Sequence, residues 1–155
     1  MNLTAKDFMT TPVISVHEST TVRDLVALLN EKSISGVPVV NDAGELVGVI
    51  SITDLLAANV GDVEYGQADF HTSPSMDGLS ELNTLLSPDK AIEEHQVGQL
   101  MSRRPITAEE SSSLGSMSKT LVQNRIHRLV TVQQGRPTGI VSVGDILRML
   151  STSES

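Results

Sequence analysis

The sequence predicts an α/β fold, with mixed α and β elements, built from two half-modules that share the element order β-α-β-β-α. The first observation is a motif that occurs twice, as GVISITDLL at 48–56 and as GIVSVGDIL at 139–147. The second is that apolar segments with matching spacing surround both copies of the motif. The third is size, because one copy of roughly 50 residues buries too little apolar surface to be stable alone. We therefore expect the two copies to pack against each other as one globular module.

Each copy is expected to begin with a short extended piece that follows a proline, at 13–16 in the first copy and at 106–107 in the second. An amphipathic helix follows, because apolar residues recur at helical spacing. These residues are Val22, Leu25, Val26 and Leu29 in the first copy and Leu114, Met117 and Leu121 in the second. We expect Ser19 or Thr20 to cap the first of these helices, since either side chain can accept from free backbone N–H groups.

Two strands joined by a turn are expected after this helix, and a further helix closes each copy. The strands are placed at 37–40 and 46–50 in the first copy and at 129–132 and 138–141 in the second, and the closing helices start near Ile52 and Val143. At the start of the copies, FMTTPV at 8–13 aligns with LMSRRPI at 100–106. This alignment implies one extra residue in the second copy.

The repeat divides the chain into a first copy at 5–57, a second copy at 94–150, a segment between them at 58–93 and a disordered tail at 151–155. The segment at 58–93 carries 7 acidic and 1 basic side chains, whereas the second copy carries 7 basic and 4 acidic ones. We interpret 58–93 as an acidic surface linker, and a docking segment or a lid over a ligand cleft is the alternative. Its leucines could form a short amphipathic turn, at Leu79, Leu82, Leu85 and Leu86. An anionic ligand is favoured in the second copy.

The composition excludes several classes of protein. Hydrophobic residues make up 39% of the 155 residues and aromatic residues only 2%, so the core must be aliphatic. Cysteine is absent, which excludes disulfides and thiol nucleophiles. No apolar segment has the length of a signal peptide or a membrane span, and we expect a soluble, cytoplasmic protein. The formal net charge of −8 argues against general nucleic-acid binding.

The repeated Ser-x-x-Asp places a hydroxyl and a carboxylate where a strand runs into a helix. Free N–H groups and the helix dipole attract phosphate at such a point, and a serine hydroxyl can donate to a phosphate oxygen. The aspartate in the first turn can accept from both hydroxyls of a ribose. Ser-x-x-Asp is also an ordinary helix cap, and both interpretations stay open for a single copy. Two copies within a matched repeat favour a ribonucleotide.

The set of motifs resembles a tandem pair of cystathionine-β-synthase (CBS) domains, often called a Bateman module. The resemblance includes FMTTPV and LMSRRPI, ISGVPVV at 34–40 and IHRLVTV at 126–132, and the two motifs that contain Ser and Asp. The second copy is especially similar to a repeat in the nucleotide-sensing γ subunit of AMP-activated protein kinase.

The resemblance implies a fold of two β-α-β-β-α units packed through their sheets with pseudo-two-fold symmetry. It implies up to two clefts for adenosine-type ligands such as AMP, ADP, ATP or S-adenosylmethionine. It also implies a homodimer and a regulatory role, such as energy sensing, that acts on an attached or partner protein.

Residue by residue, the resemblance assigns Asp54 and Asp145 to ribose, and Ser51 and Ser142 to phosphate. The other matching positions are Val37, Pro38 and Leu129 at the adenine edge, Val13, Ile14, Ile106 and Thr107 on the other side of the base, and His127 and Arg128 at a phosphate. With so few aromatic residues, aliphatic side chains would sandwich the purine.

The two copies differ at several of these positions, so the two clefts are not expected to be equivalent. The unlike pairs are Pro38 and Val130, Ser35–Gly36 and His127–Arg128, and Thr53 and Gly144. We expect the stronger phosphate site to use His127, Arg128, Ser142 and Asp145. Which of the two clefts the basic pair serves is left open.

The remaining histidines, His17, His71 and His95, lack metal-ligand spacing and are expected at the surface. Met9 and Met101 occupy equivalent positions and are expected in the core. The first functional hypothesis is a non-catalytic regulatory module that binds adenine nucleotides, with no catalytic cofactor. The alternatives are an interaction module with vestigial clefts and an S-adenosylmethionine sensor. An enzyme is poorly supported, because no nucleophile or acid–base pair stands out.

Overall fold

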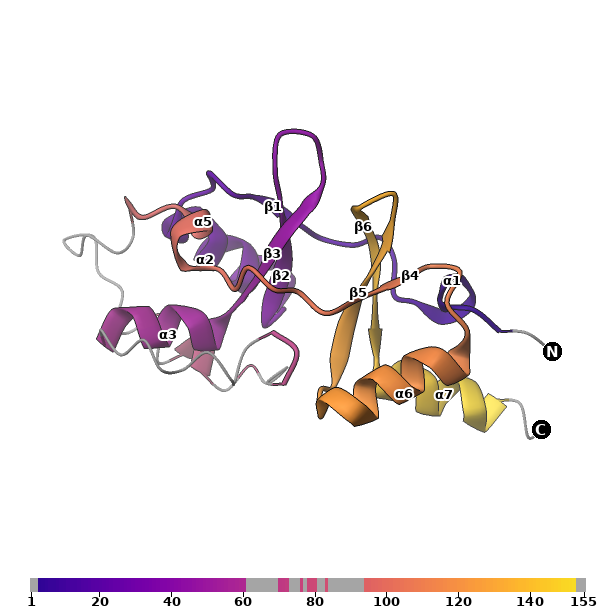
Figure 1. Cartoon of the computed structure of the whole chain (residues 1–155). Coiled ribbons are helices and arrows are strands. Elements are labelled where there is room, and N and C mark those ends of the chain that lie inside the picture. The colour runs from indigo at the N-terminus through magenta and orange to yellow at the C-terminus, as the bar shows by residue number, and fades with distance from the viewer. Residues whose placement is uncertain are drawn as a thin grey trace.

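The computed structural model describes residues 3–60, 70–72, 76, 78–80, 83 and 94–152. Two three-stranded sheets lie near the middle of the molecule, and the helices lie toward its outer sides (Figure 1). The first half contains β1 (Val16–His17), α2 (Val22–Lys32), β2 (Gly36–Val40), β3 (Leu46–Ser51) and α3 (Ile52–Val60). The second half contains β4 (Thr107–Glu109), α6 (Leu114–Asn124), β5 (Arg128–Gln133), β6 (Arg136–Ser142) and α7 (Val143–Thr152). The predicted fold class and the β-α-β-β-α order of both halves are confirmed.

The two sheets have the same topology. In each, the first strand is parallel to the second and the second is antiparallel to the third. Val16 pairs with Val39 in the first sheet, and Ala108 pairs with Thr131 in the second sheet. Each residue of the second pair therefore lies 92 positions after its counterpart in the first pair. The predicted extra residue in the second copy is therefore wrong. The two prolines used for that alignment are not structurally equivalent, and Ile14 corresponds to Ile106.

The first helix of each half has an equivalent cap. The hydroxyl of Thr21 accepts from the N–H of Asp24 at 3.2 Å, and the hydroxyl of Ser113 accepts from the N–H of Ser116 at 3.1 Å. The prediction of Ser19 or Thr20 as the cap is wrong, because α2 begins at Val22 and the capping residue directly precedes a helix. At the other end, α7 continues two residues beyond the predicted boundary at 150, and residues 153–155 lie outside the described residues.

Two short helices are exchanged between the halves. Helix α1 (Ala5–Phe8) lies at the start of the first copy but packs on the second half, where the N–H of Ala5 donates to the carbonyl of Ser112. Helix α5 (Val97–Leu100) lies near the start of the second copy but packs on the first half, where the N–H of Val97 donates to the carbonyl of Thr20. Figure 1 shows this exchange, with the indigo α1 beside α6 and α7 and the orange α5 beside α2.

The glycine of each repeated motif makes this exchange possible. A Cβ at Gly48 would lie 2.5 Å from the carbonyl oxygen of Ser102 and 2.6 Å from the sulfur of Met101. A Cβ at Gly139 would lie 2.8 Å from the sulfur of Met9. Both methionines pack in the cores as predicted. Met9 packs against the second half and Met101 against the first half.

We expect Gly48→Ala to destabilise the fold by about 1–3 kcal/mol, because the added methyl group meets backbone that cannot simply rotate away. Gly115 offers a matched control, since it is exposed in α6 and a Cβ there meets nothing within 4 Å. Gly115→Ala should stabilise by up to about 1 kcal/mol through helix propensity. Urea denaturation of the two variants measures both changes, and an unchanged midpoint for Gly48→Ala would contradict the close approach.

The segment at 58–93 is not a surface linker where it is described. Phe70, which is 1% exposed, packs between the halves with Val49 of β3 and with Val130 and Val132 of β5. Farther along, Leu79 is buried against the core of the first half. The predicted amphipathic turn falls mostly outside the described residues, since only Leu79 of its four leucines is described.

This segment also covers the helices of the first half. A Cβ at Gly78 would lie 2.8 Å from Leu56 of α3, and the side-chain amides of Asn30 and Asn83 donate to each other at 3.0 Å. The equivalent surface of the second half has no such cover in the described part of the chain, and Val122 and Leu147 are 76% and 60% exposed. The two halves thus share a fold but present different outer faces.

Candidate ligand-binding site

One cavity between the halves brings together six of the predicted site residues. It has a volume of about 260 Å³, and we call it the Asp145 cleft. The six are Val13, Ile14, Pro38, Arg128, Ser142 and Asp145. The first half supplies the aliphatic wall, from the segment before β1 and from β2. The second half supplies the polar wall, from the end of β6 and the first turn of α7.

Asp145 is held rigidly at the start of α7. It is only 6% exposed, and its Oδ2 accepts from the N–H of Ser142 at 2.9 Å. Its Oδ1 accepts from Arg148 at 3.0 Å, and the hydroxyl of Thr10 lies 3.4 Å from both carboxylate oxygens. Because Thr10 belongs to the first copy of the repeat and Asp145 to the second, this contact joins the two copies at the cleft.

The serines of the two motifs use their hydroxyls differently. The hydroxyl of Ser142 accepts from the N–H of Asp145 at 3.1 Å, which leaves its own proton available for an acceptor in the cleft. The hydroxyl of Ser51 donates to Asp54 at 3.1 Å, so its proton is already used. Both motifs therefore act as helix caps, and only the second keeps a hydroxyl donor for a ligand.

A second cavity adjoins the Asp145 cleft at the beginning of α7. It has a volume of about 470 Å³ and shares Arg128 and Ser142 with the cleft. His127, Thr72 and Gly144 also line it. The N-terminus of α7, a cationic side chain and a hydroxyl therefore border one space, which suits an anion. Of the basic pair, Arg128 lines both cavities and His127 lines the second one.

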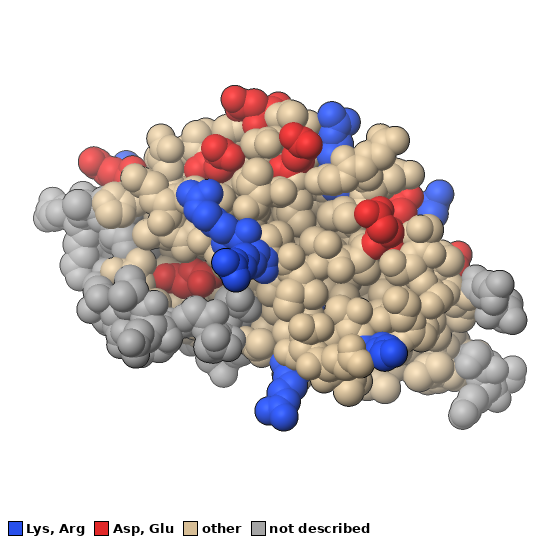
Figure 2. Space-filling model, in the orientation of Figure 1, with Lys and Arg blue, Asp and Glu red and all other residues tan. Residues whose placement is uncertain are grey.

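Arg128 is fixed by the segment between the copies. Its guanidinium lies 3.9 Å from the centre of the Phe70 ring, and its Nε donates to the carbonyl of Phe70. The counterpart of Arg128 in the first half is Gly36, where a Cβ would lie 3.0 Å from Phe70 and 3.2 Å from Arg128. Because Gly36 has no side chain, the ring of Phe70 and the guanidinium of Arg128 both fit beside it. Figure 2 shows Lys and Arg side chains gathered near the centre of the face in view.

The remaining predicted residues lie elsewhere. The side chains of Val37 and Leu129 are buried in the cores of their own halves. Thr53 lies in the first turn of α3. Thr107 is exposed on β4, and the side chain of Ile106 packs against the core of the second half. Any ligand contact at Val37 or Leu129 would therefore come from the backbone.

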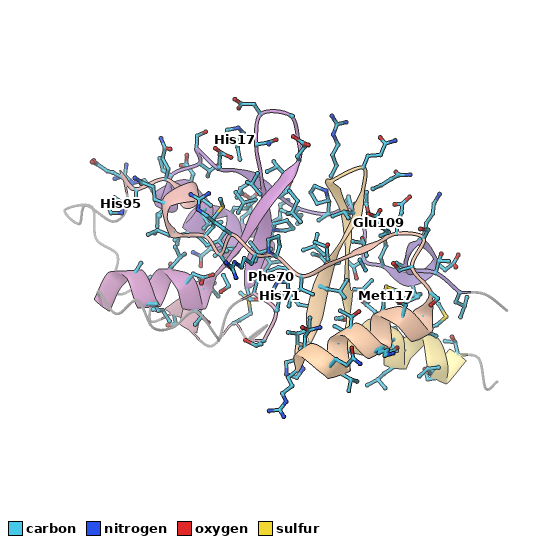
Figure 3. The ribbon with its side chains drawn as sticks, viewed as in Figure 1. His17, Phe70, His71, His95, Glu109 and Met117 are labelled. Atoms are coloured by element: carbon cyan, nitrogen blue, oxygen red, sulfur yellow. The ribbon has the colours of Figure 1, made fainter. Side chains whose placement is uncertain are left out.

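The expectation that His71 lies at the surface is wrong. This residue is 2% exposed and lies beside Phe70 between the two halves (Figure 3). Its ring nitrogens contact the backbone of Ile106 and Arg128, each at 3.0 Å. His17, in contrast, contacts Asp42 in an exposed position, and His95 is exposed as predicted.

Residues that sequence reasoning missed include Thr10 and Phe70, which line the cleft, and Arg148, which contacts Asp145. Arg148 could have been found, because it follows Asp145 at i+3 on a predicted helix. Thr10 could have been found as well, since Ser102 offers a hydroxyl at the equivalent position of the other copy. Nothing in the sequence marked Phe70, which lies in the only long segment without a repeat partner.

Two features are absent from the described part of the chain. No helix there is long and apolar enough to cross a membrane. Nor do the described residues include a group of three or more His, Cys, Asp or Glu side chains arranged to hold a metal ion.

Comparison with known proteins identifies the family. The family model of the CBS domain matches residues 5–61 and again residues 97–152, which together are most of the chain. The chain is a pair of CBS domains. The resemblance noted in its motifs is thereby confirmed, and each half of the structure corresponds to one CBS domain.

Two curated relatives resemble the chain over nearly its whole length. The chloroplastic CBS domain-containing protein CBSX2 of Arabidopsis thaliana is 34% identical over 153 residues, which cover 94% of this chain and 62% of the plant protein. An uncharacterised protein of Methanocaldococcus jannaschii is 33% identical over 155 residues, and the match covers 94% of this chain and 89% of that protein. The chain therefore spans less than two thirds of the plant protein and most of the archaeal one.

Solved structures of CBS domain pairs share the fold. The crystal structure of CBSX2 in complex with AMP superimposes with a TM-score of 0.70 at 30% identity, and the match covers 98% of each chain. The acetoin utilization protein AcuB of Vibrio cholerae has a TM-score of 0.72 at 18% identity, with 99% of this chain and 94% of that chain covered. The second likeness concerns the fold alone.

Proposed function

We propose that this CBS domain pair is a non-catalytic regulatory module that binds an adenine nucleotide in the Asp145 cleft. One observation carries the proposal: an aliphatic cavity lined by a buried carboxylate shares Arg128 and Ser142 with a second cavity, which His127 and the start of α7 also line. A base needs an aliphatic wall, a ribose needs an acceptor such as the carboxylate of Asp145, and a phosphate needs positive charge. The complex of CBSX2 with AMP supports the same ligand class.

The charge around the second cavity favours a nucleotide over S-adenosylmethionine. Arg128 carries a positive charge, and the N-terminus of α7 adds a partial positive charge. A phosphate is attracted by both, whereas the sulfonium of S-adenosylmethionine is repelled. Among AMP, ADP and ATP the proposal makes no choice, because the second cavity, with about 470 Å³, has room for more than one phosphate group.

Calorimetric titration of the full chain tests this function. AMP, ADP or ATP should bind more tightly than adenosine, and the difference should shrink as salt is added, because the phosphate contact is electrostatic. S-adenosylmethionine, titrated under the same conditions, should bind more weakly than AMP. If none of the nucleotides produces heat, or if adenosine binds as well as AMP, the proposed phosphate site is wrong.

We further propose a homodimer formed through α6 and α7. Val122 and Leu147 are exposed there, together with Leu150, while the equivalent helices of the first half are contacted by Gly78, Leu79 and Asn83. Burial of exposed apolar side chains is the usual driving force for such association. Analytical ultracentrifugation of the titrated samples measures the mass, and a monomer at all concentrations would contradict this interface.

A protein-interaction module is the second candidate function. The segment at 58–93 supports it, because its described residues Phe70 and Leu79 pack into the fold and its sequence carries 7 acidic side chains. Deletion of the whole segment would remove Phe70 from the core, so charge-neutralising substitutions are the better test. The regulated partner protein and the cytoplasmic location stay predictions from the sequence.

A further inference from the structure

Pseudo-symmetry defines a second position between the halves that corresponds to the Asp145 cleft. Equivalent positions differ by 92 residues up to the second strand of each half and by 91 from the third strand onward. Ile14 and Gly36, which line the Asp145 cleft, therefore correspond to Ile106 and Arg128. Asp145 itself corresponds to Asp54. The backbone of Ile106 and Arg128 thus marks this second position, which we call the Asp54 cleft.

A part of the chain itself lies at this position. The N–H of Ile106 donates to Nε2 of His71, and Nδ1 of the same ring contacts the carbonyl oxygen of Arg128. The N–H of His127 donates to the backbone carbonyl of His71 at 2.8 Å, and the N–H of Arg128 approaches it at 3.3 Å. Four backbone groups at the edge of the Asp54 cleft therefore contact one residue.

These contacts fix the tautomer of His71 and give its ring a definite pattern. Because Nε2 accepts from Ile106, a neutral ring carries its proton on Nδ1 and donates to Arg128. The ring therefore presents one donor and one acceptor to the backbone. Adenine presents the same kind of pattern, with an amino donor beside a ring-nitrogen acceptor. The imidazole can take the backbone partners that a purine would use.

We propose that His71 occupies the base position of the Asp54 cleft, so that one chain binds a single adenosine-type ligand, in the Asp145 cleft. This inference rests on the proposed function, since it specifies which of the two clefts the ligand enters. It agrees with the other differences between the clefts. Arg148, which pairs with Asp145, corresponds to Ala57, and the hydroxyl proton of Ser51 is already directed to Asp54.

The burial of the neighbouring residue argues that this arrangement persists in the folded protein. Phe70 is fully enclosed between the sheets and stacks against Arg128. His71 and Phe70 also contact each other edge to face, with ring centres 5.3 Å apart. To vacate the Asp54 cleft, the chain would have to move the imidazole away from this packed residue. A nucleotide must therefore compete with contacts that are already made.

The number of AMP molecules bound per chain tests the inference. Calorimetry with AMP should give one site for the wild-type chain and two for His71→Ala, because the truncated side chain leaves the backbone groups of Ile106 and Arg128 to a second base. In the background of Asp145→Ala, which weakens the first site, His71→Ala should restore AMP uptake. His95→Ala is the matched control, since His95 is exposed, and it should leave the stoichiometry at one.

Several results would overturn the inference. Two AMP sites in the wild-type chain would do so, and so would a single site in a folded His71→Ala variant. If that variant does not fold, the imidazole signals of His71 in the wild-type chain provide the test, since saturation with AMP should leave the ring bonded and buried. Displacement of the ring by AMP would contradict the proposal. A wild-type chain that takes up no AMP contradicts the proposed function instead, while a gain of uptake by His71→Ala would still support the occupied cleft.

Discussion

Asp145→Ala should weaken AMP binding by at least about 100-fold. A carboxylate that accepts from both ribose hydroxyls makes two hydrogen bonds to a charged group, and each contributes about 1.5–3 kcal/mol. Since 1.4 kcal/mol corresponds to a factor of ten, loss of the pair gives this decrease. The carboxylate is already fixed by Ser142, Thr10 and Arg148, so little ordering is needed when the ligand binds. Calorimetry with AMP measures the change.

Asp54→Ala is the matched control for this substitution. Asp54 accepts from the N–H of Ser51 at 2.9 Å, just as Asp145 accepts from Ser142, so both variants lose a helix cap worth about 1 kcal/mol. Only Asp145→Ala should lose ligand affinity, because the Asp54 cleft contains His71. Equal loss of affinity in the two variants would mean that both clefts bind AMP or that the capping role alone matters.

Phe70→Ala should lower the free energy of unfolding by about 3–5 kcal/mol, which is the usual cost of removing a buried phenyl ring. A small domain has a total stability of about 5–15 kcal/mol, so the loss is a large part of it. The ring fills the space between Val49 on one sheet and Val130 on the other and supports the guanidinium of Arg128. Urea denaturation measures the midpoint and its slope.

Phe8→Ala provides the comparison, because Phe8 is only half-buried, at the edge of the second core. It should cost clearly less than Phe70→Ala. Phe70→Leu should recover much of the lost stability, since an apolar side chain of similar volume refills the space. If Phe8→Ala and Phe70→Ala destabilise equally, the segment that contains Phe70 does not join the two halves in solution.

The repeated parts of the chain could be predicted well from sequence, for a physical reason. Strand alternation and helical spacing are local patterns. Because each element occurs twice, the same pattern can be recognised independently in each copy. The closing helices begin at Ile52 and Val143 as predicted. The unrepeated segment offers no such comparison. Acidic, Gly- and Ser-containing sequence is typical of a surface segment, and nothing local indicated that Phe70 and His71 are buried.

The alignment of the copies shows a different limit. Proline is a conspicuous residue, but its position within an extended segment is not fixed by packing. Strand pairing is fixed, because a shift of one residue would turn every side chain to the opposite face of the sheet. The pairing of Thr107 with Val130 therefore identifies which residues of the two copies are equivalent. The match of Pro12 with Pro105 gives a different and wrong alignment. In the candidate site, the carboxylates and serines were found by motif, whereas Thr10 reaches Asp145 only through the folded chain.

The exchange of α1 and α5 determines what a shorter chain could do. A polypeptide with only residues 94–155 would keep a helix that belongs to the missing half and would lack the one that completes its own. A single copy of the repeat could close its structure only by borrowing that helix from another molecule. In a chain with two copies, each half takes the helix from the other half of the same molecule. The effective concentration of that helix therefore no longer depends on the protein concentration.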